Sequence, residues 1–334
     1  MSEARRLLLA IAVGLIVLVG IPAGVLTWFG LRPVVTPYPC VLEIKPGRAF
    51  ISVARELEDA GVVADSRALR LLARLQGVDR GIQAGVYRFS GNNTPIGILE
   101  TLHSGRGELL SCTIPEGLNA VEIAARCSAA GLGRSERYMQ LLQDNDFIAT
   151  LGLSEPRIEG YLFPETYHFA PGTSEATVLK TMVAQMQKQL QPELIEGAAR
   201  NGLDAHALVT LASIIQKEAA NDAEMTRISA VFHNRLRRNM RLQADPTTIY
   251  ALDAFNGKLT RADLRVVHPY NTYVVFGLPP GPIASPGVAA LHAAAFPAED
   301  DALYFVATRD GGHHFSKTLR EHNNAVRRYR QQGK

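Results

Sequence analysis

The sequence predicts an α+β protein with a single N-terminal transmembrane helix, a small βααβ unit and a larger mixed α+β domain. Its 334 residues are about twice the length of an average domain. Hydrophobic residues make up 47% and charged residues 20%, which excludes an intrinsically disordered chain. An uncharged apolar segment opens the chain, and short strand–helix patterns give way to longer helical ones after it. The net charge of +3 is too small for a dedicated nucleic-acid binder.

Residues 7–31 are the first predicted element, a membrane-spanning helix. This stretch carries no charged residue and as a helix would extend roughly 38 Å, enough to cross a hydrocarbon core of about 30 Å. Arg5 and Arg6 precede it, and Trp28 lies near its far end, where aromatic residues gather in membrane helices. A cleaved signal peptide is the alternative, but its apolar segment usually has about 7–15 residues. We therefore expect a single-pass protein of the inner (cytoplasmic) membrane, with residues 1–6 in the cytoplasm and the folded domains in the periplasm.

Residues 32–42 contain three prolines and are expected to form a stiff stalk. Residues 43–110 follow with a strand, helix, helix, strand pattern in which Gly61 ends the first helix. This order and size match a LysM module, so we expect a LysM-like subdomain. Ile44-Lys45-Pro46-Gly47 and Ile114-Pro115-Glu116-Gly117 each precede a helical run that ends in Ala-Gly. The pattern indicates an internal repeat, with two unrelated strand–helix units as the alternative.

Residues 111–334 are expected to form one mixed α+β domain. Asp204 is the predicted N-cap of a helix that continues to about Ala219, and Asp222 is the predicted N-cap of the next helix. Two β-rich stretches joined by a glycine-containing turn predict a hairpin over residues 303–315. A basic amphipathic helix closes the chain.

The three cysteines are too few for a disulfide scaffold. A disulfide between Cys112 and Cys127 and a pair of buried free thiols are equal alternatives, because Cys127 falls in a helical pattern. The disulfide would leave Cys40 unpaired.

No motif for a cofactor or a metal is found. The sequence has no P-loop, no Gly-x-Ser-x-Gly elbow, no Ser-x-x-Lys pair and no His-Glu-x-x-His. His313 and His314 are adjacent in the predicted hairpin, and because neighbouring strand residues point to opposite faces, they are unsuited to one metal site. We expect no cofactor, no metal and no nucleic-acid partner, which leaves carboxylate chemistry as the candidate.

Glu218 is the candidate catalytic residue. Leu208, Leu211 and Ile215 form an apolar stripe on the predicted helix, and Glu218 falls on this stripe. A carboxyl group on an apolar face is poorly solvated, which raises its pKa, and the negative end of the helix dipole acts in the same direction. A glutamic acid that stays partly protonated near neutral pH is what general acid catalysis requires. A surface or capping residue at a helix end is the alternative.

Three short segments combine amides, hydroxyls, carboxylates and aromatic rings, the groups that bind sugars. They are Glu159–Tyr167, Leu242–Tyr250 and Tyr270–Tyr273. Each segment taken alone is equally well explained as a turn with satisfied polar groups, but three of them beside a candidate acid favour a polysaccharide cleft. The candidate substrate-binding residues are Gln243, Asp245, Thr247, Thr248, Tyr250, Asn271, Tyr273, Tyr161 and Glu165.

Five ordered motifs resemble those of one known family. They are ASIIQKEAA, VFHNRLRRNMRLQADPTTIY, YNTY, GLPPGPIASPG and LYFVATRDGGHHF. The sequence is similar to the endolytic murein transglycosylases, the MltG or YceG-like family, over nearly its whole length. One departure is visible: family members commonly carry a second glutamate two residues before the catalytic one, where this chain has Gln216.

The resemblance implies an inner-membrane lyase that cuts peptidoglycan glycan strands internally, with Glu218 as the catalytic residue. The implied reaction breaks the MurNAc–GlcNAc β-1,4 bond without water and leaves a 1,6-anhydro-MurNAc end. Termination of nascent strands, with peptidoglycan synthases as partners, is the expected cellular role. Residues 111–334 would then be the catalytic domain.

Two other functions stay open at this point. One is a muramidase-type hydrolase that uses Asp245 or Glu165 as a second carboxylate. The other is a non-catalytic, anchored peptidoglycan-binding scaffold that acts through the LysM-like region. The basic stretch from Arg235 to Arg241 is expected to be a solvated helix face, with attraction to the carboxylates of peptide stems as the alternative.

Overall fold

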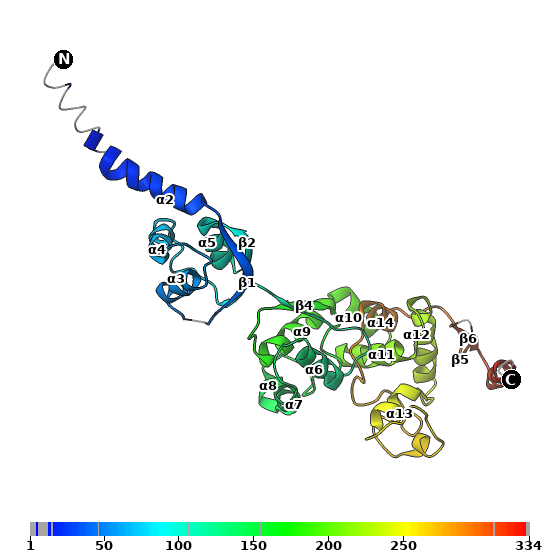
Figure 1. Ribbon diagram of the computed structural model, residues 1–334. Coiled ribbons are helices and arrows are strands. Elements are labelled where there is room, and N and C mark those ends of the chain that lie inside the picture. The colour runs from blue at the N-terminus through cyan, green and yellow to red at the C-terminus, as the bar shows by residue number, and fades with distance from the viewer. Residues whose placement is uncertain are drawn as a thin grey trace. The chain divides into compact units, whose positions relative to one another are not determined.

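Figure 1 shows the computed structural model, which describes residues 5, 13–14, 16–45, 47–105, 107–153, 155–309 and 311–331. By its internal contacts the chain divides into two compact units. The first unit runs to Leu110 and also includes His168–Gly172. The second unit comprises Ser111–Tyr167 and the chain from Thr173 onward.

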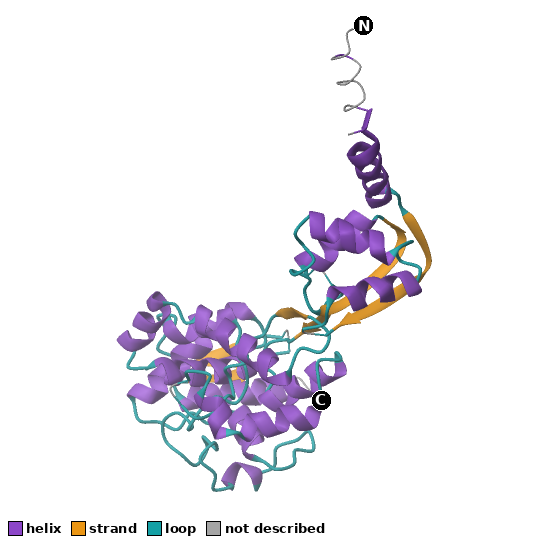
Figure 2. Cartoon of the chain, turned by 90° about the vertical axis from the view of Figure 1, so that its left-hand side faces the viewer, coloured by secondary structure: helices purple, strands orange, loops and turns teal. Residues whose placement is uncertain are grey.

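Helices dominate both units, and the strands of the described ranges pair two by two (Figure 2). The sheets are β1–β2, β3–β4 and β5–β6. The predicted α+β class is confirmed.

The N-terminal segment consists of a short π-helix, η1 (Ile16–Gly20), and α2 (Ile21–Leu31). Val25 and Trp28 of α2 are exposed, whereas Gly30 is buried. Among the residues that the structure describes, no helix is both long and apolar enough to cross a membrane. The predicted span over residues 7–31 lies partly outside the described residues and stays a prediction.

The first unit follows the predicted order of strand, helix, helix and strand. Its elements are β1 (Val34–Ile44), α3 (Phe50–Asp59), α4 (Ser66–Leu75), β2 (Gly85–Asn93) and an additional helix, α5 (Pro95–Ser104). The strands are antiparallel, and their buried residues join those of the helices in one apolar core.

Strand β1 covers most of the stretch in which a proline-rich stalk was expected. Its register with β2 shifts between Thr36 and Cys40, and Pro37 and Pro39 lie within that shift. A proline cannot donate a ladder hydrogen bond, so an irregularity of this kind is where a strand tolerates it. The prolines therefore mark an interruption in a strand.

The recurring Ala-Gly ending produces the same helix end in both units. Gly61 follows α3 with φ 68°, and its equivalent Gly131 follows α6 with φ 80°, a region that favours glycine. After each glycine the chain turns back to its helix: Val62 N–H donates to the Leu57 carbonyl (2.8 Å), and Leu132 N–H donates to the Cys127 carbonyl (3.0 Å).

The elements from Leu110 onward include every helix and strand that positions the candidate site. In chain order they are β3 (Leu110–Thr113), α6 (Ala120–Ala129), α7 (Ser135–Gln143), α8 (Asn145–Ala149), β4 (Thr166–Phe169), α9 (Glu175–Gln189), α10 (Pro192–Arg200), α11 (Ala205–Glu218), α12 (Asp222–Arg237), α13 (Asp245–Ala251), the 3-10 helix η2 (Asp263–Arg265), α14 (Val288–Ala295), β5 (Tyr304–Ala307), β6 (His313–Ser316) and α15 (Leu319–Gln331).

Helix α11 lies at the centre of the second unit and packs against α10, α12, α13 and α14. Asp204 is its N-cap, as predicted, and accepts a hydrogen bond from Ala207 N–H (2.7 Å). All residues from Leu208 to Ile215 are buried, so the predicted apolar stripe is part of a helix that is covered on every side. The helix ends at Glu218, and α12 begins only a few residues later.

The C-terminal hairpin and closing helix form as predicted. Strands β5 and β6 pair antiparallel, with Tyr304 opposite Ser316, and α15 packs against both. The predicted N-cap Asp222 is instead the first residue of α12, and Asn221 precedes it as the N-cap.

Both Cys112 and Cys127 are buried free thiols whose sulfur atoms lie 3.8 Å apart, and Cys40 is a partly exposed free thiol. Burial raises the pKa of Cys112 and raises the pKa of Cys127 to about 12.

Candidate active site

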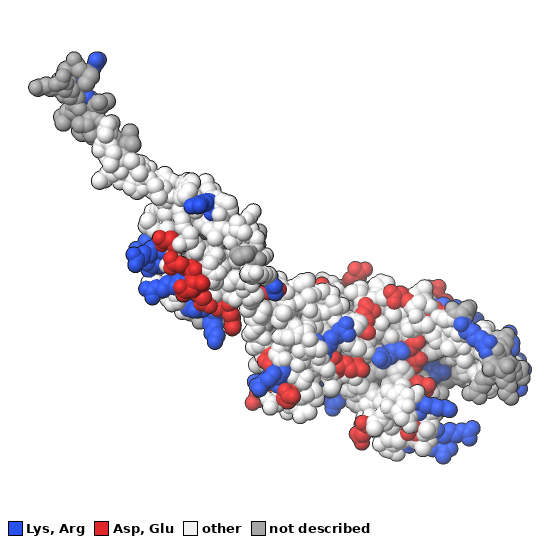
Figure 3. Space-filling view, in the orientation of Figure 1, with Lys and Arg blue, Asp and Glu red and all other residues white. Residues whose placement is uncertain are grey.

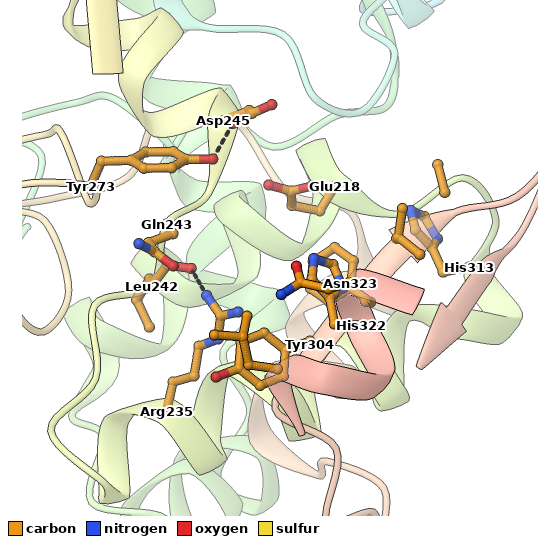
Figure 4. A pocket seen from close by; sticks show the side chains of 14 residues that line it. Glu218, Arg235, Leu242, Gln243, Asp245, Tyr273, Tyr304, His313, His322 and Asn323 are labelled. Carbon is orange, nitrogen blue, oxygen red and sulfur yellow. Dashed lines mark hydrogen bonds between the residues drawn. The ribbon is translucent and has the colours of Figure 1, made fainter. Parts of the chain in front are cut away.

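A cavity of about 430 Å³ in the second unit has Glu218 in its wall (Figure 4). The end of α11, the middle of α12, the loop into α13 and the C-terminal hairpin with α15 all contribute to it. The lining residues are Glu218, Arg235, Leu242, Gln243, Asp245, Tyr273, Tyr304, Phe305, Val306, Ala307, His313, Leu319, His322 and Asn323.

The Glu218 carboxyl group is half-buried, and its pKa is raised from 4.5 to about 8. Burial is the largest cause and the negative charge of Asp245 is the second, whereas the Arg235 charge and a hydrogen bond from the Asp245 backbone N–H act in the opposite direction. The shift has the predicted direction. At neutral pH the group is therefore mostly protonated, which suits a proton donor.

Asp245 is the first residue of α13 and is held on two sides. Tyr273 donates its hydroxyl hydrogen to Asp245 Oδ1 at 2.6 Å, as Figure 4 shows, and the Asp245 backbone N–H points to Glu218. Burial raises the pKa of Tyr273, so the phenol remains a donor. The structure thus places a neutral carboxylic acid, a second carboxyl group and a phenol around one cavity.

Gln243 lines the same cavity from a strained backbone position. Its φ is 49°, in the left-handed region, which costs a non-glycine residue about 1–2 kcal/mol. Its backbone N–H donates to the Thr272 carbonyl at 3.1 Å, which holds the loop in this conformation. Strain of this kind persists where the surrounding structure determines the backbone, and it is common at functional sites.

Three predicted sugar-binding residues belong to the framework of the loop instead. Thr247, Thr248 and Asn271 are fully buried. Thr247 Oγ1 lies 2.7 Å from Thr272 Oγ1, and Thr248 donates to Asn271 Oδ1 at 2.9 Å. These bonds tie α13 to the Tyr270–Tyr273 segment, so the three side chains position the wall of the cavity and do not face it.

Arg235 is buried, and the expectation of a solvated helix face is wrong for it. Only 8% of its surface is exposed. Its guanidinium donates to the carbonyls of Leu303 (2.7 Å) and Leu242 (2.6 Å) and so links α12 to both sides of the cavity. Arg235 follows Ile228 and Val231 at helical spacing, so its place on the apolar face was readable from the sequence.

The C-terminal hairpin supplies a wall that the sequence did not assign to the site. Glu224, in the first turn of α12, accepts hydrogen bonds from the backbone N–H of His313 and from its ring Nδ1, both at 2.8 Å. These two bonds fix the His313 ring at the edge of the cavity. Tyr304 stacks on His322 of α15 with ring centroids 5.3 Å apart, which joins the strand to the closing helix.

A second cavity, of about 290 Å³, is lined by Lys217, Pro246 and Tyr250, and Glu159 lies in its wall. Glu159 accepts hydrogen bonds from Ala120 N–H (3.1 Å) and from the Tyr250 hydroxyl (3.2 Å). Burial raises its pKa to about 7. Tyr250 is therefore next to a carboxyl group, but in a different cavity from Glu218.

Tyr161 and Glu165 are not among the residues that line either cavity. Tyr161 is buried, and its hydroxyl lies 2.9 Å from His206 Nδ1. Glu165 is exposed, and its backbone carbonyl accepts a hydrogen bond from Ile114 N–H. In the ranges that the structure describes, no three histidine, cysteine, aspartate or glutamate residues are grouped so as to hold a metal ion.

Residues 42–328 match the family described as YceG-like. A Bacillus subtilis protein named endolytic murein transglycosylase is 34% identical over 304 residues, covering 86% of this chain and 84% of that protein. A Streptococcus pneumoniae protein of the same name (serotype 2, strain D39) is 29% identical over 315 residues; the match covers 85% of this chain but 57% of the relative. The crystal structure of a YceG-like protein from Listeria monocytogenes superposes with a TM-score of 0.60 at 31% identity, covering 86% of this chain and 98% of that one. The chain therefore belongs to the YceG-like family.

Proposed function

We propose that this chain is an endolytic murein transglycosylase, a lyase that cleaves the MurNAc–GlcNAc β-1,4 bond within glycan strands. The observation that carries the proposal is the Glu218 carboxyl group, which faces a polar cavity and is protonated at neutral pH because its pKa is about 8. The names of the similar proteins from B. subtilis and S. pneumoniae support the same activity.

In the first step Glu218 acts as the general acid. Its proton passes to the oxygen that bridges MurNAc C1 and GlcNAc C4, and the C1–O bond breaks to release the GlcNAc hydroxyl. Positive charge develops at C1 in such reactions. Asp245, when ionised, is placed to stabilise that charge from the same cavity, and the Tyr273 hydroxyl holds it there.

In the second step the Glu218 carboxylate acts as the base. It takes the proton of the MurNAc 6-hydroxyl, whose oxygen bonds to C1 and closes the 1,6-anhydro ring. No water is consumed, and Glu218 regains its proton. The attacking hydroxyl belongs to the sugar itself, so proximity replaces the second catalytic group that a hydrolase needs.

A muramidase-type hydrolase is the second candidate, and the position of Asp245 is the observation that favours it. Asp245 and Glu218 line one cavity, as the acid and the nucleophile or base of a hydrolase would. Glu165 is exposed and lines neither cavity, so Asp245 is the better candidate for the second carboxylate.

The rest of the chain has an anchoring and binding role in this proposal. Residues 7–31 form the single transmembrane helix, with residues 1–6 in the cytoplasm. Strand β1 follows, so the glycan-binding LysM-like subdomain, expected over residues 43–110, begins already at Val34. Residues 111–334 form the catalytic domain in the periplasm. Cleavage there would terminate nascent strands, which makes peptidoglycan synthases the expected partners.

The test compares Glu218→Gln with Glu165→Gln in the full chain, using purified sacculi and mass spectrometry of the released fragments. Both substitutions remove one carboxyl group and keep the side-chain size. We expect anhydro products from the wild type and from Glu165→Gln and none from Glu218→Gln. Retained sacculus binding by Glu218→Gln would separate catalysis from binding. Equal cleavage by Glu218→Gln and wild type would refute the assignment of Glu218, whereas sacculus binding without cleavage by the wild type would favour the scaffold function.

A further inference from the structure

Helix α4 of the first unit carries three arginines on the face opposite the core. Arg67, Arg70 and Arg74 are three and four residues apart, so they lie on one side of the helix, whereas Leu69 and Leu72 are buried on the other. In the part of the chain that the structure describes, none of the three side chains makes a hydrogen bond or an ion pair with a protein group, and Arg70 Nε is buried without a partner. Figure 3 shows basic side chains at the outer edge of this unit, near α3 and α4, beside a band of acidic side chains.

These arginines border a cavity of about 470 Å³ that also has apolar walls. Phe50, Ile51 and Leu71 line it, and Ile51 and Leu71 are 42% and 51% exposed. One acidic residue, Asp79, is also in the wall, but among the described residues no ion pair joins it to an arginine. The cavity therefore offers excess positive charge beside exposed aliphatic and aromatic surface, a combination suited to an anion that carries an apolar tail.

The same unit contains the apolar helix α2, which packs directly against α4 and α5. A Cβ atom at Gly30 would lie 3.2 Å from a Leu72 methyl carbon and 3.1 Å from an Ile96 methyl carbon, so glycine lets α2 pack closely against both side chains. At the end of α2 the Arg32 guanidinium lies 4.7 Å from the ring centroid of Trp28, which is 60% exposed. An aromatic residue and a basic residue at the end of an apolar helix are typical of the membrane–water interface.

We propose that the arginine face of α4 and its cavity bind the phosphate headgroups of anionic phospholipids. Guanidinium groups bind phosphate oxygens with paired hydrogen bonds, and Phe50, Ile51 and Leu71 would contact the glycerol and the first methylenes. The three charges would then be neutralised by the lipid instead of by the protein. The location of this site at a membrane rests on the proposed anchor, whereas its chemistry is independent of the reaction at Glu218.

The test measures lipid binding by the full chain in neutral detergent micelles, with native mass spectrometry and short-chain phosphatidylglycerol as the probe. The triple variant Arg67→Gln, Arg70→Gln, Arg74→Gln should bind it on the order of 100-fold more weakly at low salt, because each arginine near an anionic lipid surface contributes about a factor of five. Phosphatidylcholine should bind weakly to both proteins. The matched control, Arg238→Gln, Arg261→Gln, Arg265→Gln, removes the same charge from exposed positions of the second unit and should bind phosphatidylglycerol like the wild type.

Several results would overturn the proposal. They are equal phosphatidylglycerol binding by the α4 variant and the wild type, an equal loss in the control, or no preference over phosphatidylcholine. If soluble muropeptides bind and phosphatidylglycerol does not displace them, the arginine face of α4 would be assigned to the carboxylates of peptide stems instead. Wild-type binding that does not weaken with salt would also overturn it, even if the variant does not fold.

The lipid measurement is separate from the proposed reaction. The α4 variant should keep the kcat of the wild type on soluble glycan strands, because its substitutions lie outside the Glu218 cavity; any weaker glycan binding by this subdomain would change KM alone. Loss of lipid binding with intact cleavage is the expected pattern. Absence of cleavage in the wild type would count against the enzyme and leave the lipid result standing.

Discussion

Replacing Asp245 by asparagine tests how the cavity sets the pKa of Glu218. Asparagine keeps the backbone N–H that points to Glu218 and an oxygen that accepts the Tyr273 hydroxyl hydrogen, so the charge is the main change. The negative charge of Asp245 is the second largest cause of the raised Glu218 pKa, after burial. Its removal must lower that pKa.

The size of the effect follows from ordinary charge–charge interactions. A neighbouring charge in a partly buried site changes a pKa by about one or more, so we expect the Glu218 pKa to fall from about 8 to roughly 7. The proton donor is lost as pH rises through this value. At pH 7 the protonated fraction would drop from about nine-tenths to about one-half, a decrease of about twofold in rate from protonation alone. Any stabilisation of positive charge at C1 by Asp245 adds to that loss.

The assay is the pH dependence of kcat/KM for cleavage of soluble glycan strands. The alkaline limb of the Asp245→Asn profile should lie about one pH unit below that of the wild type. At pH values below this limb the variant should keep substantial activity. If Asp245 is instead the second carboxylate of a hydrolase, the variant should lose at least about 100-fold at every pH. An unchanged alkaline limb would refute the electrostatic reasoning, and complete loss would refute the assignment of Asp245.

Three further predictions concern stability and accessibility. Glu218→Gln should stabilise the fold by about 1–2 kcal/mol at pH 8 and not at pH 4. The pKa of Glu218 is higher in the folded than in the unfolded protein, so the wild-type fold loses stability as pH rises from 4.5 toward 8. Urea unfolding at both pH values measures the difference. Glu224→Gln should destabilise the fold at neutral pH by about 1 kcal/mol and raise KM, because it weakens the two hydrogen bonds to His313. The pKa of Glu224 is lowered in the folded protein, so the stability that its carboxylate contributes is lost as pH falls. The stability difference between variant and wild type should therefore shrink at acid pH. Cys40 alone should react with a thiol reagent in the native protein, whereas all three cysteines should react in denaturant; fast native labelling of the other two would contradict their burial.

The position of Glu218 was predictable because local patterns determine it. The Asp204 N-cap begins α11, and the helix ends at Glu218 within one residue of the expected end. The raised pKa also follows from placing a carboxyl group on a buried helix. These features depend on neighbours in the chain, which a single sequence displays.

Which polar side chains face the cavity was not predictable in the same way. Thr247, Thr248 and Asn271 have the chemistry of sugar-binding residues but hydrogen-bond across the loop, and only the tertiary fold brings those partners together. The helical spacing of Arg235 from Ile228 and Val231 indicates its buried face, but only the tertiary fold supplies the Leu303 carbonyl to which it donates. The burial of Glu159 likewise depends on elements distant in sequence, namely the start of α6 and Tyr250 of α13.

Cleavage of purified murein in water enriched in heavy oxygen tests the central claim most directly. The full chain digests sacculi in this water, and mass spectrometry reads the new MurNAc ends. Ring closure by the 6-hydroxyl predicts anhydro ends that carry no heavy oxygen, and their complete absence with Glu218→Gln. Reducing MurNAc ends that contain one heavy oxygen would show that water attacks C1, and would contradict the proposed non-hydrolytic reaction.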